Sequence, residues 1–242
     1  MSAVSTRWRS AARSDTGKVR QRNEDAVLDL PERGLWVVAD GMGGHQNGAL
    51  ASRLIVETLA EPSNGNLQER LDELRQRLHT LNRLFGQELT VTAENPDPVI
   101  GSTVVALLIE DNRAVCVWAG DSRCYLWRNS RLYQLSRDHT LQQQLIDEQQ
   151  LSPRDAARHP SAQALTRAIG AAEELKLELL ELDILPGDTF MLCSDGLWGS
   201  LSVDQLSAAL NLPSPQLTLH RLFEQVLDGP ARDNLSAVVV RQ

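Results

Sequence analysis

Apolar segments that lead into acidic, glycine-containing turns most constrain how this chain can fold. In the clearest case Leu35–Ala39 reads as a buried strand and runs into Asp40-Gly41-Met42-Gly43-Gly44-His45, before an amphipathic segment. A glycine-rich turn costs backbone entropy, and a carboxylate beside a core is unfavourable unless something neutralises it. Taken alone, Asp40-Gly41 fits an ordinary turn equally well. However, Asp121, Asp195 and Asp233 recur beside other apolar runs, which favours a bound metal ion.

The segment before this strand predicts a β-hairpin with acids near both of its ends. Asn23-Glu24-Asp25 precedes a short apolar run, Ala26–Leu28, and the turn 31–34 connects that run to Leu35–Ala39. Because the strands of an antiparallel hairpin run side by side, Glu24 and Asp25 should approach Asp40. A solvated turn at 23–25 is the alternative, but two or three carboxylates on a strand pair are typical of a metal site.

Composition bounds the class of protein. The 242 residues, 42% hydrophobic and 23% charged, fit one large domain or two small ones of a soluble globular protein. The net charge of -8 argues against nucleic acid or an anionic membrane as a partner. No apolar run approaches the ~20 residues of a membrane span and no secretory signal is evident, so we expect a cytoplasmic location. Cys116, Cys124 and Cys193 lie in apolar runs and should be reduced core residues.

The order of elements predicts a layered α+β fold rather than alternating β-α-β units. Residues 1–13 read as a first strand or a loose end, and 138–170 reads as a helical insertion between sheet-forming regions. A phase change in 175–184 suggests a bulge. Helices are expected at 47–60, from Asn66 through Leu84, at 141–149, from Ser152, from Ser202 and from Ser214. Strands are expected at 102–109, 113–119, 123–127, 131–135, 175–184, 189–193 and 235–240. The first three should be joined by short turns, and taken alone 119–123 fits a hairpin turn with Asp121 as the turn former.

The acids at these strand ends have no His or Cys at ligand spacing, and oxygen-only ligands select hard ions such as Mg²⁺ or Mn²⁺. So many acids predict a binuclear site, in which two ions activate a water for in-line displacement at phosphorus. No nucleophile elbow or Cys-based phosphate loop is present. The acids are Glu24, Asp25, Asp40, Asp121, Asp195 and Asp233.

These motifs, taken in order, resemble those of the PPM family, the metal-dependent serine/threonine protein phosphatases of the 2C type, in bacterial form. The resemblance covers roughly residues 12–242. It is carried by Arg20–Asp25, Asp40–His45, Gly101–Thr103, Ala119–Arg123, Asp138-His139, Leu165–Gly170, Ser194–Leu197 and Arg232–Asn234. It implies a single catalytic domain over 1–242, built as a four-layer α-β-β-α sandwich of two antiparallel sheets flanked by helices. The helical insertion, 138–170, would be the family's flap.

The resemblance also implies a different ligand role for each of the acids. Asp40 would bridge two Mn²⁺ or Mg²⁺ ions, Asp195 and Asp233 would complete one, and Glu24 and the Gly41 carbonyl the other. Further positions that match the motifs are Asp25 as a supporting acid, Asp121 with Asp195 for a third, weaker ion, and Arg20 for the substrate phosphate.

One position departs from the animal-type motif, in which a histidine proposed as the general acid directly follows Asp-Gly. Here that position is Met42, as in other bacterial members. The leaving group's proton would come from a bound water or from His45. A packing role at a turn and helix start explains the presence of His45 about as well as a catalytic role does.

We therefore expect an enzyme that hydrolyses phosphoserine and phosphothreonine on proteins, reversing a bacterial Ser/Thr kinase. Its partners would be the phosphorylated substrates and that kinase, not nucleic acid or membrane, and it would act as a cytoplasmic monomer. A catalytically dead adaptor that binds phosphoproteins is disfavoured because every matched metal acid is present. A hydrolase of small phosphoesters remains an alternative, because such a site recognises only a phosphate.

Overall fold

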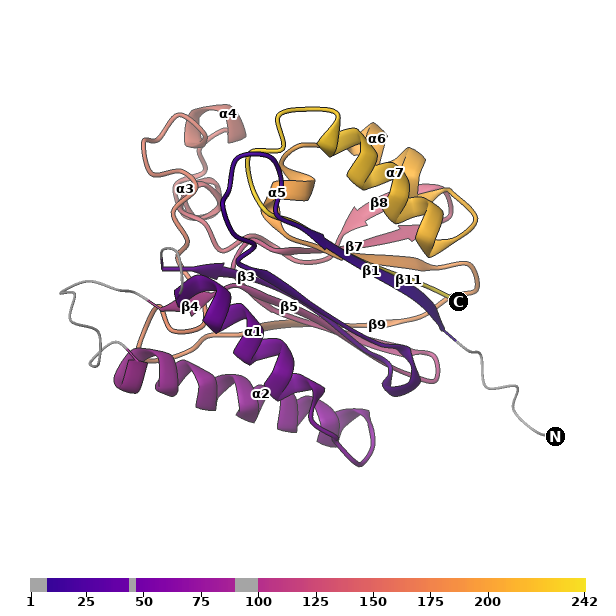
Figure 1. The fold of residues 1–242 in the computed structure, drawn as a ribbon, viewed down its shortest axis with the longest axis horizontal. Helices are drawn as coiled ribbons and strands as arrows, with labels where there is room; N and C mark the ends of the chain where they lie inside the picture. Colours follow the sequence, from indigo (N-terminus) through magenta and orange to yellow (C-terminus); the bar gives the residue numbers. More distant parts are fainter. Residues whose placement is uncertain (1–7, 44–46, 90–99) are drawn as a thin grey trace.

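The computed structural model describes residues 8–43, 47–89 and 100–242. Two antiparallel sheets are stacked face to face and helices cover their outer faces, as the sequence predicts (Figure 1). One sheet contains β1 (Arg9–Asp15), β11 (Leu235–Arg241), β10 (Thr189–Cys193), β7 (Arg123–Arg128) and β8 (Arg131–Gln134), in that order. The other contains β2 (Asp25–Leu30), β3 (Leu35–Met42), β5 (Val104–Glu110), β6 (Arg113–Ala119) and β9 (Glu178–Asp183), with β4 (Gly101–Ser102) paired to β3.

Two pairs of helices form the outer layers (Figure 1). The β3 sheet is covered by α1 (Asn47–Ala60) and α2 (Leu67–Arg83), and the β11 sheet by α6 (Val203–Leu210) and α7 (Pro215–Leu227). Shorter segments are η1 (Pro31–Arg33), η2 (Leu84–Leu89), α3 (Leu141–Gln149), α4 (Pro153–Ala156) and α5 (Asp195–Trp198). No helix in the described ranges is both long and apolar enough to cross a membrane.

Residues of β3 show why the central strands are apolar throughout. Val37 and Ala39 pack toward α1 and α2, whereas Trp36 and Val38 pack between the two sheets. Successive side chains of a strand point to opposite faces, so a strand buried on both faces loses the usual polar alternation. The three cysteines are free and buried, as expected, with Cys116 and Cys124 between the sheets and Cys193 in the core beneath α6 and α7.

Helix signals in the sequence are confirmed in detail. Asn66 and Glu69 form a reciprocal capping box at the start of α2, and Ser202 and Gln205 do the same for α6. Such caps satisfy backbone N–H groups that have no partner within the helix. The leucine stripe continues one residue beyond α2, into the π-helical turn η2.

Three expectations need correction. The strand predicted at 175–184 begins only at Glu178, and its pairing with β6 is continuous from Trp118 to Arg113, without a bulge. The apparent phase change arises because Leu175 and Leu177 precede the strand and pack into the α1–α2 core. The short helix α5 was not expected. Finally, 119–123 is not a hairpin turn, because β6 and β7 belong to different sheets.

This crossover places Asp121 between the sheets. Gly120 adopts φ +114°, and a Cβ there would lie 2.6 Å from the Thr103 side chain. Glycine therefore permits both the backbone conformation and the close approach. The crossover, the end of β3, the end of β10 and the start of β11 all lie at one end of the sandwich, where the acids gather.

Candidate metal centre

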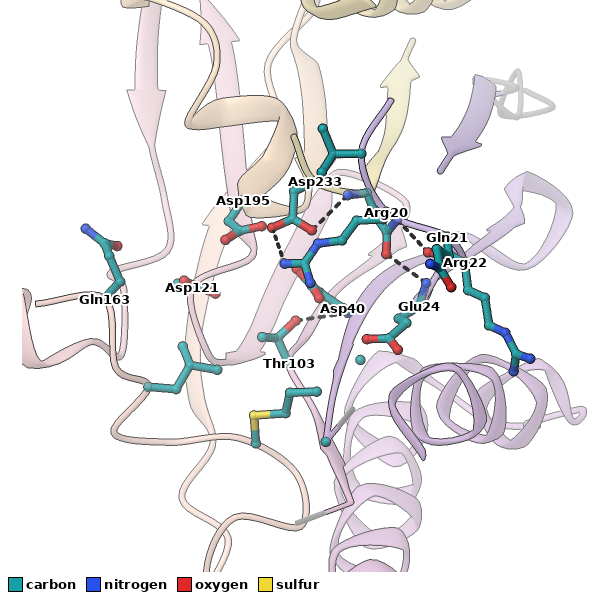
Figure 2. A pocket seen from close by; sticks show the side chains of 16 residues that line it. Arg20, Gln21, Arg22, Glu24, Asp40, Thr103, Asp121, Gln163, Asp195 and Asp233 are labelled. Atoms are coloured by element: carbon teal, nitrogen blue, oxygen red, sulfur yellow. Dashed lines mark hydrogen bonds and ion pairs between the residues drawn. The ribbon is translucent and has the colours of Figure 1, made fainter. Parts of the chain in front are cut away.

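A cavity of about 570 Å³ opens at this end of the two sheets. Loop residues before β2, the end of β3, the β6–β7 crossover, the start of α5 and the loop before β11 line it (Figure 2). Most of the predicted site residues are among the lining residues, namely Arg20, Glu24, Asp40, Gly41, Asp121, Asp195 and Asp233.

Asp40 lies at the centre of this arrangement. Its carboxyl lies beside that of Asp195, and its backbone N–H donates to the Thr103 hydroxyl at 3.1 Å. Removal from bulk water, followed by the charge of Asp25, raises the pKa of Asp40 well above its ordinary value. Removal from water also raises the pKa of Asp195, with the Asp233 charge next in importance. Without a cation, two carboxyls this close favour the neutral form of at least one of them.

Asp25 pairs with Asp40 across the predicted hairpin, so the two strands bring these acids together as expected. Asp25 is buried, and its Oδ2 accepts a 2.8 Å hydrogen bond from the Ser194 hydroxyl. Its Oδ1 is buried without a hydrogen-bond partner among the described residues. Burial raises the pKa of Asp25 to about 6. A buried carboxylate oxygen without a partner is costly, and a nearby cation would relieve that cost.

Glu24 and Gly41 are positioned through the backbone. The Gly41 N–H donates to the Glu24 carbonyl at 3.1 Å, and the Glu24 N–H donates to the Asn234 side chain at 2.8 Å. A Cβ on Gly41 would lie only 2.1 Å from the Gly48 carbonyl oxygen at the start of α1. Gly41 is therefore required for α1 to pack against the end of β3, quite apart from its carbonyl.

Asp121 is buried on the opposite side of the cavity from Glu24 (Figure 2). Burial, followed by the charges of Asp195 and Asp138, raises its pKa to about 7. Its carbonyl accepts a 3.0 Å hydrogen bond from the Trp198 indole, and the preceding Gly120 N–H donates to His139 Nδ1 at 3.1 Å. The crossover is thus held by α5 on one side and by the start of the predicted flap on the other.

Arg20 enters the cavity from the loop before β2. Its Nη2 lies 2.9 Å from Asp233 Oδ2 (Figure 2), and this contact raises the pKa of the guanidinium. Both side chains remain partly exposed. Arg20 therefore neutralises one carboxylate of the cluster while keeping donors available for an anion in the cavity.

The donor set fits a hard cation, although the side chains are not yet arranged around one. All candidate donors are oxygens, which suits Mg²⁺ or Mn²⁺. No three His, Cys, Asp or Glu side chains of the described ranges are close enough to form a ready-made coordination cluster. The ion pair with Arg20 engages one oxygen of Asp233 that a cation would bind.

Several residues that support the acids were not assigned roles from sequence. Thr103 binds the backbone of Asp40 and the hydroxyl of Ser122, Ser194 binds Asp25, and Asn234 spans three backbone groups. Ser194 and Asn234 directly adjoin Asp195 and Asp233, so their position beside a candidate ligand is the signal that could have identified them. Predicted His45 lies outside the described residues, whereas Met42 lines the cavity.

The sequence and the fold both have known relatives. The sequence model of the family described as Protein phosphatase 2C matches residues 16–238. The chain is 36% identical over 241 residues to the serine/threonine protein phosphatase PstP of Mycobacterium tuberculosis, covering 99% of this chain but only 46% of PstP. It is 32% identical over 191 residues to the serine/threonine phosphatase stp of Listeria monocytogenes, covering 76% of each protein. The chain thus spans about half the length of PstP.

Solved structures show the same fold. PppA, described as a key regulatory component of the type VI secretion system in Pseudomonas aeruginosa, superposes with a TM-score of 0.89 and 43% identity, over 98% of both chains. The catalytic domain of PstP, solved in complex with two manganese ions, superposes with a TM-score of 0.81 and 36% identity, over 97% of both chains.

Proposed function

Because the chain belongs to the Protein phosphatase 2C family, we propose that it is a metal-dependent phosphatase that hydrolyses phosphoserine and phosphothreonine on proteins. The observation that carries the proposal is the convergence of strand-end carboxylates and Arg20 in one cavity. This combination provides ligands for hard cations and a donor for a phosphate in the same space.

The acids would hold two Mn²⁺ or Mg²⁺ ions, and a third more weakly. Asp40 lies between the remaining acids and would bridge two ions, with Asp195 and Asp233 on one and Glu24 and the Gly41 carbonyl on the other. Asp25 would support Asp40, and Asp121 with Asp195 would hold the third ion. Bound there, the cations would supply an activated water near neutral pH and positive charge for the phosphate in the transition state.

Arg20 would bind the substrate phosphate. Its guanidinium offers several N–H donors in a planar fork, which suits two oxygens of one phosphate. At present one of these donors holds Asp233, so phosphate binding requires Arg20 to loosen this contact. A cation bound to Asp233 would weaken the attraction that restrains Arg20, so the Arg20 side chain would become available to the substrate.

The insertion 138–170 would act as the flap of a single catalytic domain over 1–242. Support comes from Gln163 and Leu165, which line the cavity together with Arg20 and the acids. A segment that contributes to the cavity wall can contact the residues around a phosphorylated side chain. The substrates would be proteins phosphorylated by a cognate Ser/Thr kinase, which the phosphatase would oppose as a cytoplasmic monomer.

Asp40→Asn provides the direct test. An amide is nearly isosteric but cannot supply the bridging negative charge, so Mn²⁺-dependent release of phosphate from a phosphothreonine peptide should fall by at least about 10³-fold. Asp183→Asn, which changes an exposed carboxylate at the end of β9, should leave the rate unchanged.

Three outcomes would contradict the proposal in different ways. Near-wild-type turnover by Asp40→Asn would exclude the bridging role. Phosphopeptide binding by the wild-type protein without Mn²⁺-dependent turnover would identify an adaptor. Turnover of a small phosphoester alone, with no activity on phosphopeptides, would identify a small-molecule hydrolase.

A further inference from the structure

Two loops that meet at one wall of the cavity carry unusual positive charge. The loop before β2 and the loop before β11 are joined by a 2.8 Å hydrogen bond from the Lys18 N–H to the Ala231 carbonyl. The Asn234 side chain also donates at 2.9 Å to the carbonyls of Thr16 and Arg22. Besides Arg20, these loops present Lys18, Arg22 and Arg232, which we call the basic rim.

The basic rim differs from the other cationic positions of the protein. All three of its side chains belong to exposed residues. Within the described ranges, no carboxylate lies within ion-pair distance of any of them, although Lys18 donates to the Gly229 carbonyl. Elsewhere cations are commonly paired, as in Arg77 with Glu73 and Arg128 with Asp188. In a chain of net charge -8, three cations without a carboxylate partner on two joined loops form a local site of attraction for anions.

Of the rim residues, Arg22 lines the cavity itself, whereas Lys18 and Arg232 each directly adjoin a lining residue. Residues 19 through 22 line the cavity wall, and Figure 2 shows Arg20 directed toward Asp233 while Arg22 extends away from the carboxylates. Arg20 and Arg22 thus point in different directions from one loop, so they can engage different groups of one bound peptide. Arg20 is suited to the phosphate, and the rim to charges beside it.

We propose that the basic rim binds acidic residues that flank the phosphorylated side chain, so that the preferred substrates are phosphoproteins with Asp or Glu within a few positions of the phosphoresidue. This inference rests on the proposed phosphatase function and adds a substrate class to it. Exposed charge pairs contribute modestly to binding and strongly to association rate. The rim would therefore discriminate among phosphorylated sites by their neighbouring charge without changing the chemistry at phosphorus.

A rim that only draws phosphate toward the acidic cavity would act equally on every phosphopeptide. The two roles are separated by comparing two phosphothreonine peptides of equal length, one flanked by Asp and Glu and the other by Ser and Gln. We expect the wild-type protein with Mn²⁺ to show a kcat/KM at least about ten-fold higher for the acidic peptide at low ionic strength. The difference should shrink in 0.5 M salt, which shortens the Debye length to roughly 4 Å.

A triple variant, Lys18→Gln with Arg22→Gln and Arg232→Gln, should lose most of this preference. Each exposed pair contributes modestly and three are removed together, so we expect kcat/KM to fall by about ten-fold on the acidic peptide and by at most about two-fold on the neutral one. Arg131→Gln, a change of an exposed cation on β8, serves as the matched control and should retain the preference.

The outcomes distinguish the role of the basic rim from the proposed phosphatase function. Equal losses on both peptides, or no wild-type preference, would overturn the role of the rim while leaving the phosphatase proposal intact. Absence of Mn²⁺-dependent turnover on either peptide would instead contradict the proposed function.

Discussion

Arg20 and Asp233 form an ion pair that both residues must loosen to perform the roles proposed for them. Arg20 would bind phosphate and Asp233 would bind a cation, yet each at present partly neutralises the other at 2.9 Å. Their positions in the sequence indicated the two roles but not this contact, because 213 residues separate them. Residue types and local motifs predict which side chains face a site, whereas their mutual pairing depends on the assembled fold.

Arg20→Ala should therefore separate metal binding from phosphate binding. Removing the guanidinium frees Asp233, so Mn²⁺ affinity should rise by up to about five-fold, the value of an exposed ion pair. The kcat/KM for a phosphothreonine peptide should fall by roughly 10- to 100-fold, because a bidentate phosphate contact is lost.

Calorimetric titration with Mn²⁺ and steady-state kinetics would measure the two effects. Arg20→Lys keeps the charge without the planar fork, and should recover little of the kinetic loss. A decrease in Mn²⁺ affinity for Arg20→Ala would show that Arg20 supports the acids rather than competing for them.

At the scale of elements, the sequence predicted the helices and strands better than the way the chain changes sheets. Caps and leucine stripes are local signals, and α1, α2, α6 and α7 begin where these signals place them. The β6–β7 crossover was expected to be a simple turn, because Gly120-Asp121 has the same local signature in both cases. Only its packing, against Thr103, His139 and Trp198, distinguishes a crossover between sheets.

Gly41→Ala should disturb the packing of α1 on β3. The new Cβ would meet backbone atoms, the Gly48 carbonyl oxygen at 2.1 Å and the Glu24 carbonyl oxygen at 2.7 Å, so no side-chain rotation can relieve the contact. We expect the free energy of unfolding to fall by about 1–3 kcal/mol or more, as measured by urea denaturation.

Gly86→Ala is the appropriate comparison, because no atom lies within 4 Å of the added Cβ. Its effect on the free energy of unfolding should stay within about 1 kcal/mol. An unchanged unfolding midpoint for Gly41→Ala would show that α1 can shift without cost.

At the scale of the whole molecule, the acid cluster joins elements of both sheets. Asp40 and Asp25 belong to one sheet, whereas Asp195 and Asp233 border strands of the other. The sequence predicted these acids as a set because each adjoins a strand end. It could not predict how strongly each would resist ionisation, because that depends on burial and on neighbouring charge in the assembled molecule.

Protein stripped of metal should become less stable as pH rises. The pKa values of Asp25 and Asp121 are raised to about 6 and about 7 from an ordinary 3.8, so between about pH 4 and 7 the folded state binds more protons than the unfolded state. The contribution of these two acids to the free energy of unfolding is complete below their ordinary pKa of 3.8 and is lost as pH rises through their raised pKa values. We expect the midpoint of thermal unfolding to be roughly 5 °C higher at pH 5.5 than at pH 7.5.

Excess Mn²⁺ should reduce this difference, since bound cations stabilise the ionised acids. The lowered pKa of buried His139 acts in the opposite direction, but it is one group opposing a cluster of acids. Scanning calorimetry at the two pH values, with and without Mn²⁺, would measure the effect. A metal-free protein that is equally stable or more stable at pH 7.5 would contradict the burial of protonated acids.

The position of β11 also has a consequence for how the protein is made. This strand pairs with β1 on one side and β10 on the other, and Asp233 and Asn234 immediately precede it. During synthesis on a ribosome, β1 emerges more than 200 residues before its partner, and such distant pairings slow folding. The sheet and the acid cluster are therefore completed in the same late step. A nascent chain would have no phosphatase activity until its β11 segment had left the exit tunnel.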